Sequence, residues 1–218
     1  SASNKILLIE GARQVGKSYV IREVGQRLFA NYVELNFVTD NEGVQLFKNV
    51  HTVDEFYLRL SSVAGDRLGN YNDTLIFLDE IQCYPQYLTL LKFLREEQKY
   101  RFIASGSALG MALRHTTSIP VGSVIIRKMY PLDFEEFLWA NNYGENAISD
   151  LYNHFLNQQS LSKEQHEQLL ELFRRYLLVG GLPDVVNEYL ATHNILNVRN
   201  LQNAIAAMYE ADASQYEN

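Results

Sequence analysis

Residues 6–18 read Ile-Leu-Leu-Ile-Glu-Gly-Ala-Arg-Gln-Val-Gly-Lys-Ser. The second half of this segment has the spacing Gly11-x-x-x-x-Gly16-Lys17-Ser18, which is the P-loop pattern that cradles phosphate groups. Because the two glycines lack a Cβ, the chain can wrap tightly and direct its backbone N–H groups at phosphate oxygens. Lys17 supplies a positive charge for the β- and γ-phosphates, and the Ser18 hydroxyl suits Mg²⁺. We therefore expect a nucleoside triphosphate as the ligand.

The residues on either side of this loop support the same interpretation. Ile6 to Ile9 is a continuous apolar run, as expected of a strand that is buried on both faces of a parallel sheet. After the loop, Val20, Val24 and Leu28 recur every fourth residue, which predicts one face of a helix. The N-terminus of that helix adds its positive dipole end to the phosphate site. The residues expected to hold the nucleotide are Gly11, Ala12, Arg13, Gln14, Val15, Gly16, Lys17, Ser18 and Tyr19.

The composition limits the class of protein. The 218 residues are 47% hydrophobic and 12% aromatic, which is typical of a globular chain of one or two domains. A net charge of −7 argues against nucleic-acid binding by bulk electrostatics. Cys83 is the only cysteine, so a disulfide framework is excluded and a reducing, cytoplasmic setting is expected. No apolar run has the length of a membrane-spanning helix.

Strands and helices are predicted to alternate along the first 143 residues. Four further apolar or β-branched runs predict strands at 32–37, 74–78, 102–104 and 124–126. The capping box Thr52-x-x-Glu55 predicts a helix that ends near Gly65, and further helices are expected over 86–99 and from Asp133. Such alternation favours an α/β fold in which helices sandwich a parallel five-stranded sheet.

A different pattern begins near Tyr143. Residues 144–165 are polar, and the capping box Ser162-x-x-Gln165 opens an amphipathic helix that stops at Gly180-Gly181. Another helix is expected over 198–209. We therefore predict a P-loop core over residues 1–143 and a small helical lid domain over residues 144–218.

A second acidic motif follows the strand over 74–78. Asp79 is expected to hold Mg²⁺ together with Ser18, and Glu80 is placed to orient or deprotonate an attacking water molecule. Ser105 follows the next strand and could contact the γ-phosphate or position that water. The alternatives are a solvated acid in a turn at Glu80, and a Ser-Gly turn at Ser105 and Ser107 that caps a helix.

These motifs resemble a prokaryotic group of AAA+-like ATPases. The resemblance rests on the P-loop, on Leu-Ile-Phe-Leu-Asp-Glu-Ile-Gln, on Ser-Gly-Ser, and on two longer blocks that begin at Met129 and Tyr176. It implies a P-loop fold with an extra strand between the strands of the two Walker motifs. It also implies ATP and Mg²⁺ as ligands, catalytic roles for Lys17, Glu80 and Ser105, and metal binding by Ser18 and Asp79. Pro183 matches an element that lies near adenine in related signalling ATPases, although a simple helix stop explains it equally well.

The chain also departs from that family. Ser123 stands where many relatives have an arginine, so no arginine finger can be assigned, and Arg114, Arg127 and Arg174 are candidates by location alone. Relatives continue beyond a position equivalent to Asn218, and we expect this chain to be the ATPase part of a longer protein. Self-association is a further expectation, and the client, protein or DNA, is not identified by the sequence.

Three functions remain open at this point. The first is an ATPase that couples hydrolysis to a conformational change of the helical lid. The second is a nucleotide-gated signalling or scaffold module that binds ATP with little hydrolysis. The third is a phosphotransferase that acts on a small molecule, for which the helical region supplies few arginines.

Overall fold

The computed structural model describes residues 4–107 and 122–215. The chain divides into two compact units, Ser1–Met129 (the first unit) and Tyr130–Asn218 (the second unit). This division falls earlier in the chain than the boundary expected after residue 143. The reason is that Phe137, in helix α6 (Phe134–Ala140), is fully buried in a hydrophobic cluster with residues of the later helices.

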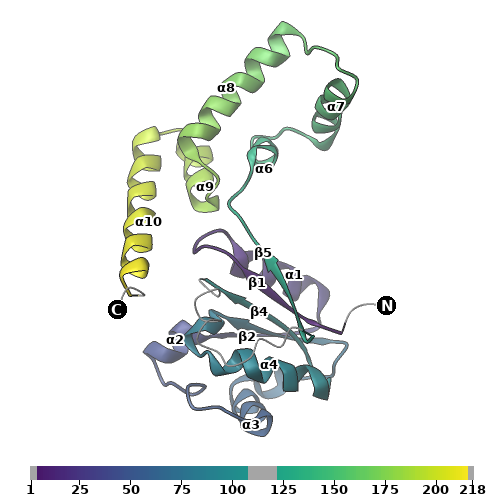
Figure 1. Cartoon of the computed structure of the whole chain (residues 1–218), viewed down its shortest axis with the longest axis vertical. Helices are drawn as coiled ribbons and strands as arrows, with labels where there is room; N and C mark the ends of the chain where they lie inside the picture. The colour runs from purple at the N-terminus through teal and green to yellow at the C-terminus, as the bar shows by residue number, and fades with distance from the viewer. Residues whose placement is uncertain (1–3, 108–121, 216–218) are drawn as a thin grey trace. The chain divides into compact units, whose positions relative to one another are not determined.

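The first unit is an α/β fold with five parallel strands, as the sequence predicted (Figure 1). The strands are β1 (Ile6–Glu10), β2 (Asn31–Asn36), β3 (Thr74–Asp79), β4 (Arg101–Gly106) and β5 (Val124–Lys128). Their order is β2-β3-β4-β1-β5, and all neighbours are parallel. β4 therefore lies between β1, which leads into the P-loop, and β3, which ends in the acidic motif, so the extra strand implied by the family resemblance is confirmed.

Helices cover both faces of this sheet. Figure 1 shows α1 on one face and α3 and α4 on the other. The helices of the first unit are α1 (Lys17–Leu28), α2 (Phe37–Glu42), α3 (Val53–Ala64) and α4 (Gln86–Glu97), and short 3-10 turns occupy Gly65–Arg67 and Ile81–Cys83. The capping box between Thr52 and Glu55 is present at the start of α3, as predicted.

The apolar face predicted for α1 was wrong. Val20, Val24 and Leu28 are exposed, and the helix buries Lys17, Ile21 and Gly25 instead. Both sets have a spacing of four, so periodicity alone cannot choose between them. The position of Lys17 decides the matter, because its side chain must enter the P-loop and residues 21 and 25 then lie on the same face of the helix.

The main core lies on the side of the sheet that α3 and α4 cover. Its aromatic centre is formed by Phe37, Phe56 and Tyr87, with ring centroids 4.5 Å apart for Phe37–Tyr87 and 6.0 Å apart for Phe56–Tyr87. The Tyr87 hydroxyl donates a hydrogen bond of 3.1 Å to the Phe47 carbonyl, which satisfies the one polar atom of that buried side chain. All six residues of β3 are buried, as expected of a central strand.

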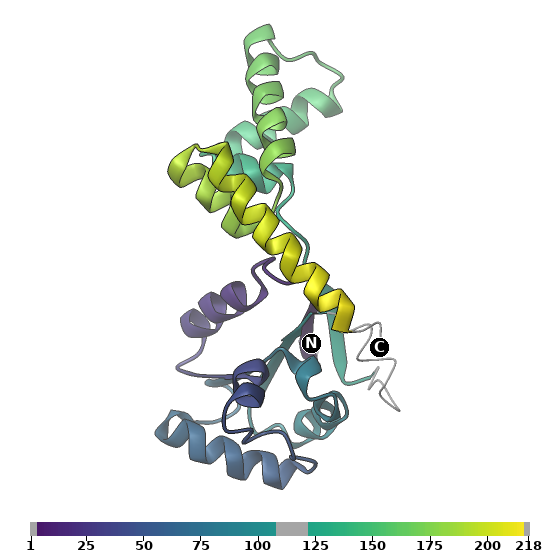
Figure 2. The ribbon, with the colours of Figure 1, turned by 90° about the vertical axis from the view of Figure 1, so that its left-hand side faces the viewer.

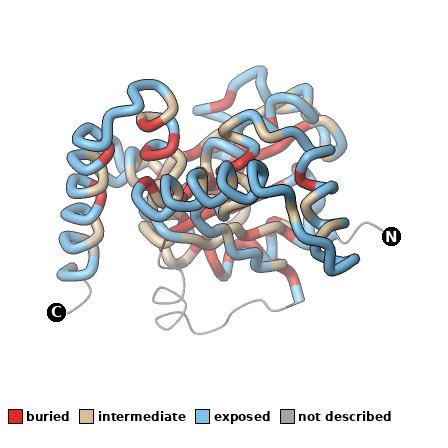
Figure 3. The backbone as a smooth tube through the Cα atoms, turned by 90° about the horizontal axis from the view of Figure 1, so that it is seen from above, coloured by how far each residue is buried: buried red, intermediate tan, exposed pale blue. Residues whose placement is uncertain are grey.

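The second unit consists of helices within the described residues, as expected for a lid domain. After α6 come α7 (Glu145–Leu156), α8 (Lys163–Val179), α9 (Pro183–Thr192) and α10 (Ile195–Gln215), and α9 lies beside α10 in Figures 1 and 2. Their core joins Phe137 to residues of α8, α9 and α10, whereas most of α10 is exposed (Figure 3). No described helix has the length and apolar character needed to cross a membrane.

A close backbone contact fixes the turn between α8 and α9. The Leu132 N–H donates to the Gly181 carbonyl at 2.7 Å, and the Tyr176 hydroxyl donates to the Leu132 carbonyl at 2.9 Å. A Cβ at position 181 would overlap the Leu132 carbonyl oxygen. Gly180 has a φ of 74° and ends α8, while Pro183 is the first residue of α9, where its missing N–H costs no helical hydrogen bond. The Gly-Gly-Leu-Pro segment is therefore both a helix stop and a packing contact.

Candidate functional site

The candidate site lies at the carboxyl edge of the sheet in the first unit. Parallel pairing aligns Ile9 of β1 with Ser105 of β4, and Leu78 of β3 with Ala104 of β4. The P-loop therefore leaves the sheet at the same edge at which Asp79 ends β3. Ligands of open α/β sheets bind at this edge, because loops and helix N-termini converge there.

The P-loop has the conformation that a phosphate cradle requires. Gly16 has a φ of 94°, in the left-handed region that favours glycine. A Cβ on Gly11 would overlap the Met129 carbonyl oxygen, so this position also requires glycine. The start of α1 follows directly at Lys17, which places the positive end of the helix dipole at the loop.

Lys17 is held inside its own loop. Its side chain is buried, and Nζ donates to the carbonyl oxygens of Gly11 at 3.0 Å and Ala12 at 2.8 Å. Burial lowers the pKa of Lys17, although the charges of Glu80 and Asp79 act in the opposite direction. An ammonium group that is desolvated and bonded to neutral carbonyls is well placed to gain from an anionic ligand.

Asp79 is the centre of the polar network. It is 3% exposed, and its carboxylate accepts hydrogen bonds from the Ser18 hydroxyl at 2.9 and 3.1 Å and from the Asn36 side-chain amide at 3.1 Å. Two more donors are the Glu80 backbone N–H at 3.1 Å and the hydroxyl of Ser105. Burial raises the pKa of Asp79, and the hydrogen bonds from Ser105 and Ser18 offset part of that effect. A hydroxyl and a carboxylate at this separation are the hard oxygen ligands that Mg²⁺ prefers, so the residues present fit this ion.

Glu80 has a left-handed backbone conformation, and two hydrogen bonds orient its side chain. Its φ of 54° and ψ of 48° lie in the left-handed region, which is uncommon for a residue with a Cβ and occurs often at functional sites. Its Oε2 atom accepts hydrogen bonds from the Gln82 side-chain amide at 2.5 Å and from the Ser107 hydroxyl at 3.2 Å. Gln82 also donates to Ser107 at 3.1 Å, so the three side chains bond to one another, while the buried Oε1 atom of Gln82 has no hydrogen-bond partner among the described residues.

The structure brings together five of the residues predicted from sequence, namely Lys17, Ser18, Asp79, Glu80 and Ser105. Ser105 is fully buried and contacts Asp79, whereas the neighbouring Ser107 contacts Glu80. Asn36 and Gln82 were not identified from the sequence. Asn36 could have been found as the polar residue that ends β2, where its side chain also caps α2 by accepting from the Thr39 N–H.

Other candidate residues lie outside this network. Pro183 belongs to the second unit, and its predicted contact with adenine stays a prediction. Arg127 is exposed on β5 and Arg174 on α8, while Arg114 lies outside the described residues. Ser123 precedes β5 at the opposite edge of the sheet, where its hydroxyl accepts a hydrogen bond of 3.1 Å from Arg95.

Comparison with known families assigns the chain to a family. A family model described as an AAA domain matches residues 3–138, which is more than half of the chain and includes every residue of the network above. The chain belongs to this AAA domain family. The family supports an ATPase-like function for the chain and ATP with Mg²⁺ as its general ligands. No curated protein matches the sequence.

Two solved structures are similar to this AAA domain protein at low sequence identity, and the one with a TM-score above 0.5 shares its fold. PCH-2 from C. elegans is 13% identical with a TM-score of 0.51, and the match covers 94% of this chain and 61% of that one. The ORC1 protein of Aeropyrum pernix, solved in complex with DNA, is 18% identical with a TM-score of 0.42, and the match covers 62% of this chain and 41% of that one. The AAA domain protein therefore spans less than two thirds of the length of either structure.

Proposed function

We propose that this AAA domain protein binds ATP together with Mg²⁺ and hydrolyses it to ADP and phosphate. The observation that carries the proposal is the convergence of Lys17, Ser18, Asp79 and Glu80 at one edge of the sheet. A P-loop alone would support only phosphate binding. The acidic pair beside it adds a metal ligand and a base, which are the two groups that hydrolysis needs.

The residues of the P-loop bind the nucleotide. The backbone N–H groups of residues 11–18 surround the phosphates, and Lys17 exchanges its carbonyl partners for phosphate oxygens. The Ser18 hydroxyl and the Asp79 carboxylate would hold Mg²⁺, which when bound neutralises charge on the phosphate oxygens. Asn36 and Ser105 keep the Asp79 carboxylate in place through their hydrogen bonds.

Glu80 acts on the attacking water molecule. As the water oxygen bonds to the γ-phosphorus and the bond from that phosphorus to the bridging oxygen of ADP breaks, the Glu80 carboxylate takes the proton that the water loses. Gln82 and Ser107 are positioning residues, because their hydrogen bonds to Oε2 fix the orientation of the Glu80 carboxylate. Their contacts also hold the side chain of Glu80 despite its left-handed backbone.

The second unit is proposed to act as a helical lid whose conformation changes with the nucleotide state. The Gly181–Leu132 contact supports this role, since it ties the α8–α9 turn to the chain that enters the lid just after β5. Under the same proposal Pro183 contacts adenine, the protein works in the cytoplasm, and copies of the chain associate.

The test compares the wild-type chain with Glu80→Gln. We expect the variant to keep Mg²⁺-dependent ATP binding within about threefold and to lose phosphate release by about 10²–10⁴-fold, the usual contribution of a general base. Gln keeps the size of the side chain, and Glu96→Gln on the exposed face of α4 serves as the matched control. Equal, slow release by wild type and Glu80→Gln would contradict hydrolysis and favour the nucleotide-gated module. Transfer of phosphate to an added nucleoside or sugar would favour a phosphotransferase.

A further inference from the structure

Helix α7 in the second unit has an apolar stripe that no described core covers. Ile148, Leu151, Tyr152 and Phe155 follow one another at intervals of three, one and three residues, which places them on one face of the helix. Only Ile148 is buried, and Tyr152 and Phe155 remain 55% and 79% exposed. A helix usually buries such a stripe against its own protein, because its stability comes mainly from that packing.

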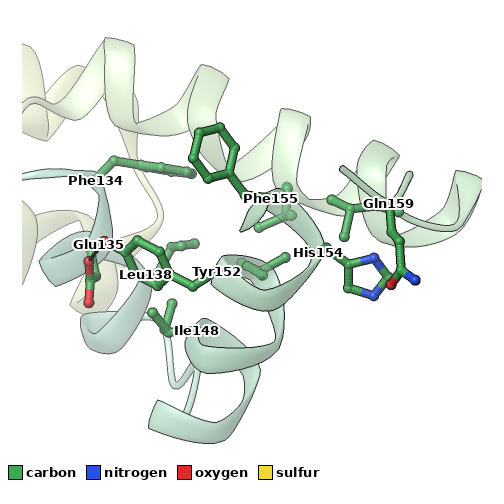
Figure 4. Close-up of a pocket in the computed structure, with 11 residues that line it drawn as sticks. Phe134, Glu135, Leu138, Ile148, Tyr152, His154, Phe155 and Gln159 are labelled. Atoms are coloured by element: carbon green, nitrogen blue, oxygen red, sulfur yellow. Dashed lines mark hydrogen bonds between the residues drawn. The ribbon is translucent and has the colours of Figure 1, made fainter. Parts of the chain in front are cut away.

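The stripe lines a groove, the α6–α7 groove, in which Phe134 and Leu138 of α6 and Leu169 of α8 form the other walls. The groove has a volume of about 580 Å³. Figure 4 shows Tyr152 and Phe155 facing the same space as Phe134 and Leu138, with Glu135 at one end and His154 and Gln159 at the other. The row from residue 148 to residue 155 extends about 10 Å at 1.5 Å per residue, which matches two turns of a second helix laid against it.

Helices α6 and α7, which form two walls of this groove, carry charges of one sign, whereas α8, the third wall, begins at Lys163 and carries both signs. Residues 130–162, which include α6 and α7, contain five Asp or Glu and no Lys or Arg. One of these acids, Glu135, lines the groove, and its carboxylate accepts a hydrogen bond of 3.0 Å from the Tyr152 hydroxyl. Asp150 lies beside the groove, with its Oδ2 atom 3.8 Å from Nε2 of the lining residue His154. The second unit as a whole has thirteen Asp or Glu against four Lys or Arg, whereas the first has thirteen against fifteen. The negative charge of the chain is therefore concentrated in the unit that carries the exposed apolar stripe.

One polar atom beside the groove lacks a partner. Nδ1 of His154 is buried and makes no hydrogen bond to any described residue. Because this atom is already closed off from the groove, the recognition of a partner rests on the apolar floor and the acidic rim.

We infer that the α6–α7 groove binds an amphipathic helix of a partner protein that carries Lys and Arg beside its apolar face. Apolar side chains of that helix, spaced three and four residues apart, cover Tyr152 and Phe155, and its cations pair with the acidic rim at Glu135 and Asp150. The positive charge expected of the partner follows from Glu135 and Asp150 and from the absence of Lys and Arg in α6 and α7. This interaction is separate from the proposed ATPase site and does not depend on it.

The test is a fluorescence-anisotropy titration of the whole chain with a labelled 18-residue peptide of Leu and Lys that forms an amphipathic helix. The control peptides are a scrambled peptide of the same composition and a peptide with Glu in place of every Lys. The protein variants are Phe155→Ser in the groove and Leu58→Ser on α3, which is 72% exposed in the first unit. A third variant, Glu135→Gln with Asp150→Asn, tests the contribution of the acidic side chains, and circular dichroism checks the helix content of each variant.

We expect the Lys peptide to bind at least tenfold more tightly than either control, and its affinity to fall as salt rises from 50 to 200 mM. Phe155→Ser weakens binding of the Lys peptide at least tenfold, and Leu58→Ser leaves it unchanged. The double variant Glu135→Gln with Asp150→Asn reduces the difference in affinity between the Lys and Glu peptides. Equal binding to Phe155→Ser and Leu58→Ser, or equal affinity for the Lys and Glu peptides, overturns the inference. Sedimentation that shows dimers of wild type but not of Phe155→Ser also overturns it, since the occupant would then be a second copy of the chain.

Discussion

The end of β3 in the first unit and the apolar stripe of α7 in the second differ in how far their own unit buries their side chains. At the end of β3, Asp79 is buried and receives hydrogen bonds from Ser18, Asn36, Ser105 and the Glu80 backbone. Along α7, large apolar side chains face outward. A site that holds a metal ion and a base needs side chains whose positions are fixed by contacts within the protein. Apolar side chains that are exposed to water are unfavourable, and a partner that covers them removes that unfavourable exposure.

The largest difference is expected from truncation of one phenylalanine in each region. Phe77→Ala in β3 removes a fully buried ring and should lower the free energy of unfolding by about 3–5 kcal/mol, because it leaves a cavity in the sheet core. Phe155→Ala in α7 should change it by less than about 0.5 kcal/mol, because that ring is already largely in water. Urea titrations followed by circular dichroism measure both, and a large loss in Phe155→Ala would contradict the exposed stripe.

A smaller effect is expected from Gly181→Ala in the second unit. The new Cβ would overlap the Leu132 carbonyl oxygen, so the α8–α9 turn must move. This movement should lower the free energy of unfolding by about 1–3 kcal/mol. Trp139 is the only tryptophan of the chain and lies in α6, so its fluorescence follows the second unit alone. Gly144→Ala is the matched control, since nothing lies near its added Cβ. Equal stability of the two variants would show that the turn is as loosely packed as α7.

In the first unit, Ser105→Ala should lower the free energy of unfolding by about 1–3 kcal/mol. The reason is that the buried Asp79 carboxylate loses one hydrogen-bond donor that water does not replace. Ser62→Ala on the exposed side of α3 removes only a bond to the Arg59 carbonyl and should change stability by less than about 0.5 kcal/mol. If Ser105→Ala is as stable as Ser62→Ala, the Asp79 network does not hold the site together.

The last comparison concerns a rate of chemical modification. Burial raises the pKa of the Cys83 thiol to about 11, from its ordinary value of 9.0. The thiolate is the reactive form, and its population rises with pH up to the pKa, so at pH 8 the folded chain should hold about a hundredfold less thiolate than the unfolded chain. Iodoacetamide labelling of native and urea-unfolded protein compares the two rates. Equal rates would mean that the turn after Glu80 is as open as α7.

The sequence predicted the first unit better than the second for a physical reason. The strands around the site are short apolar runs that end in Gly11, Asp79 and Ser105, so pattern and chemistry point to the same edge of the sheet. The face of α1 was wrong because two residue sets share one period, and only the position of Lys17 selects between them. Asn36 was missed because it lies 43 residues from its partner Asp79 in the sequence. Gln82 stands two residues after Glu80, but only the folded structure shows that its amide donates to the Glu80 carboxylate.

In the second unit the sequence predicted helices but not how they pack. The helix α7 lies within a segment that reads as polar, and its four apolar residues do not reveal whether they join a core. The division between the units was placed too late because the capping box at Asp133 fits a helix of either unit. Tertiary packing of Phe137 decides the question, and no local pattern encodes it.

The most direct test of the central claim is calorimetry of Mg²⁺-dependent ATP binding by wild type and by Lys17→Ala, with Lys48→Ala as a control for loss of one exposed lysine. If the edge of the sheet is a nucleotide site, wild type and Lys48→Ala bind ATP with similar affinity and Lys17→Ala loses binding by at least tenfold, because the buried cation that meets the phosphates is gone. No binding by wild type, or equal binding by Lys17→Ala, would contradict the account.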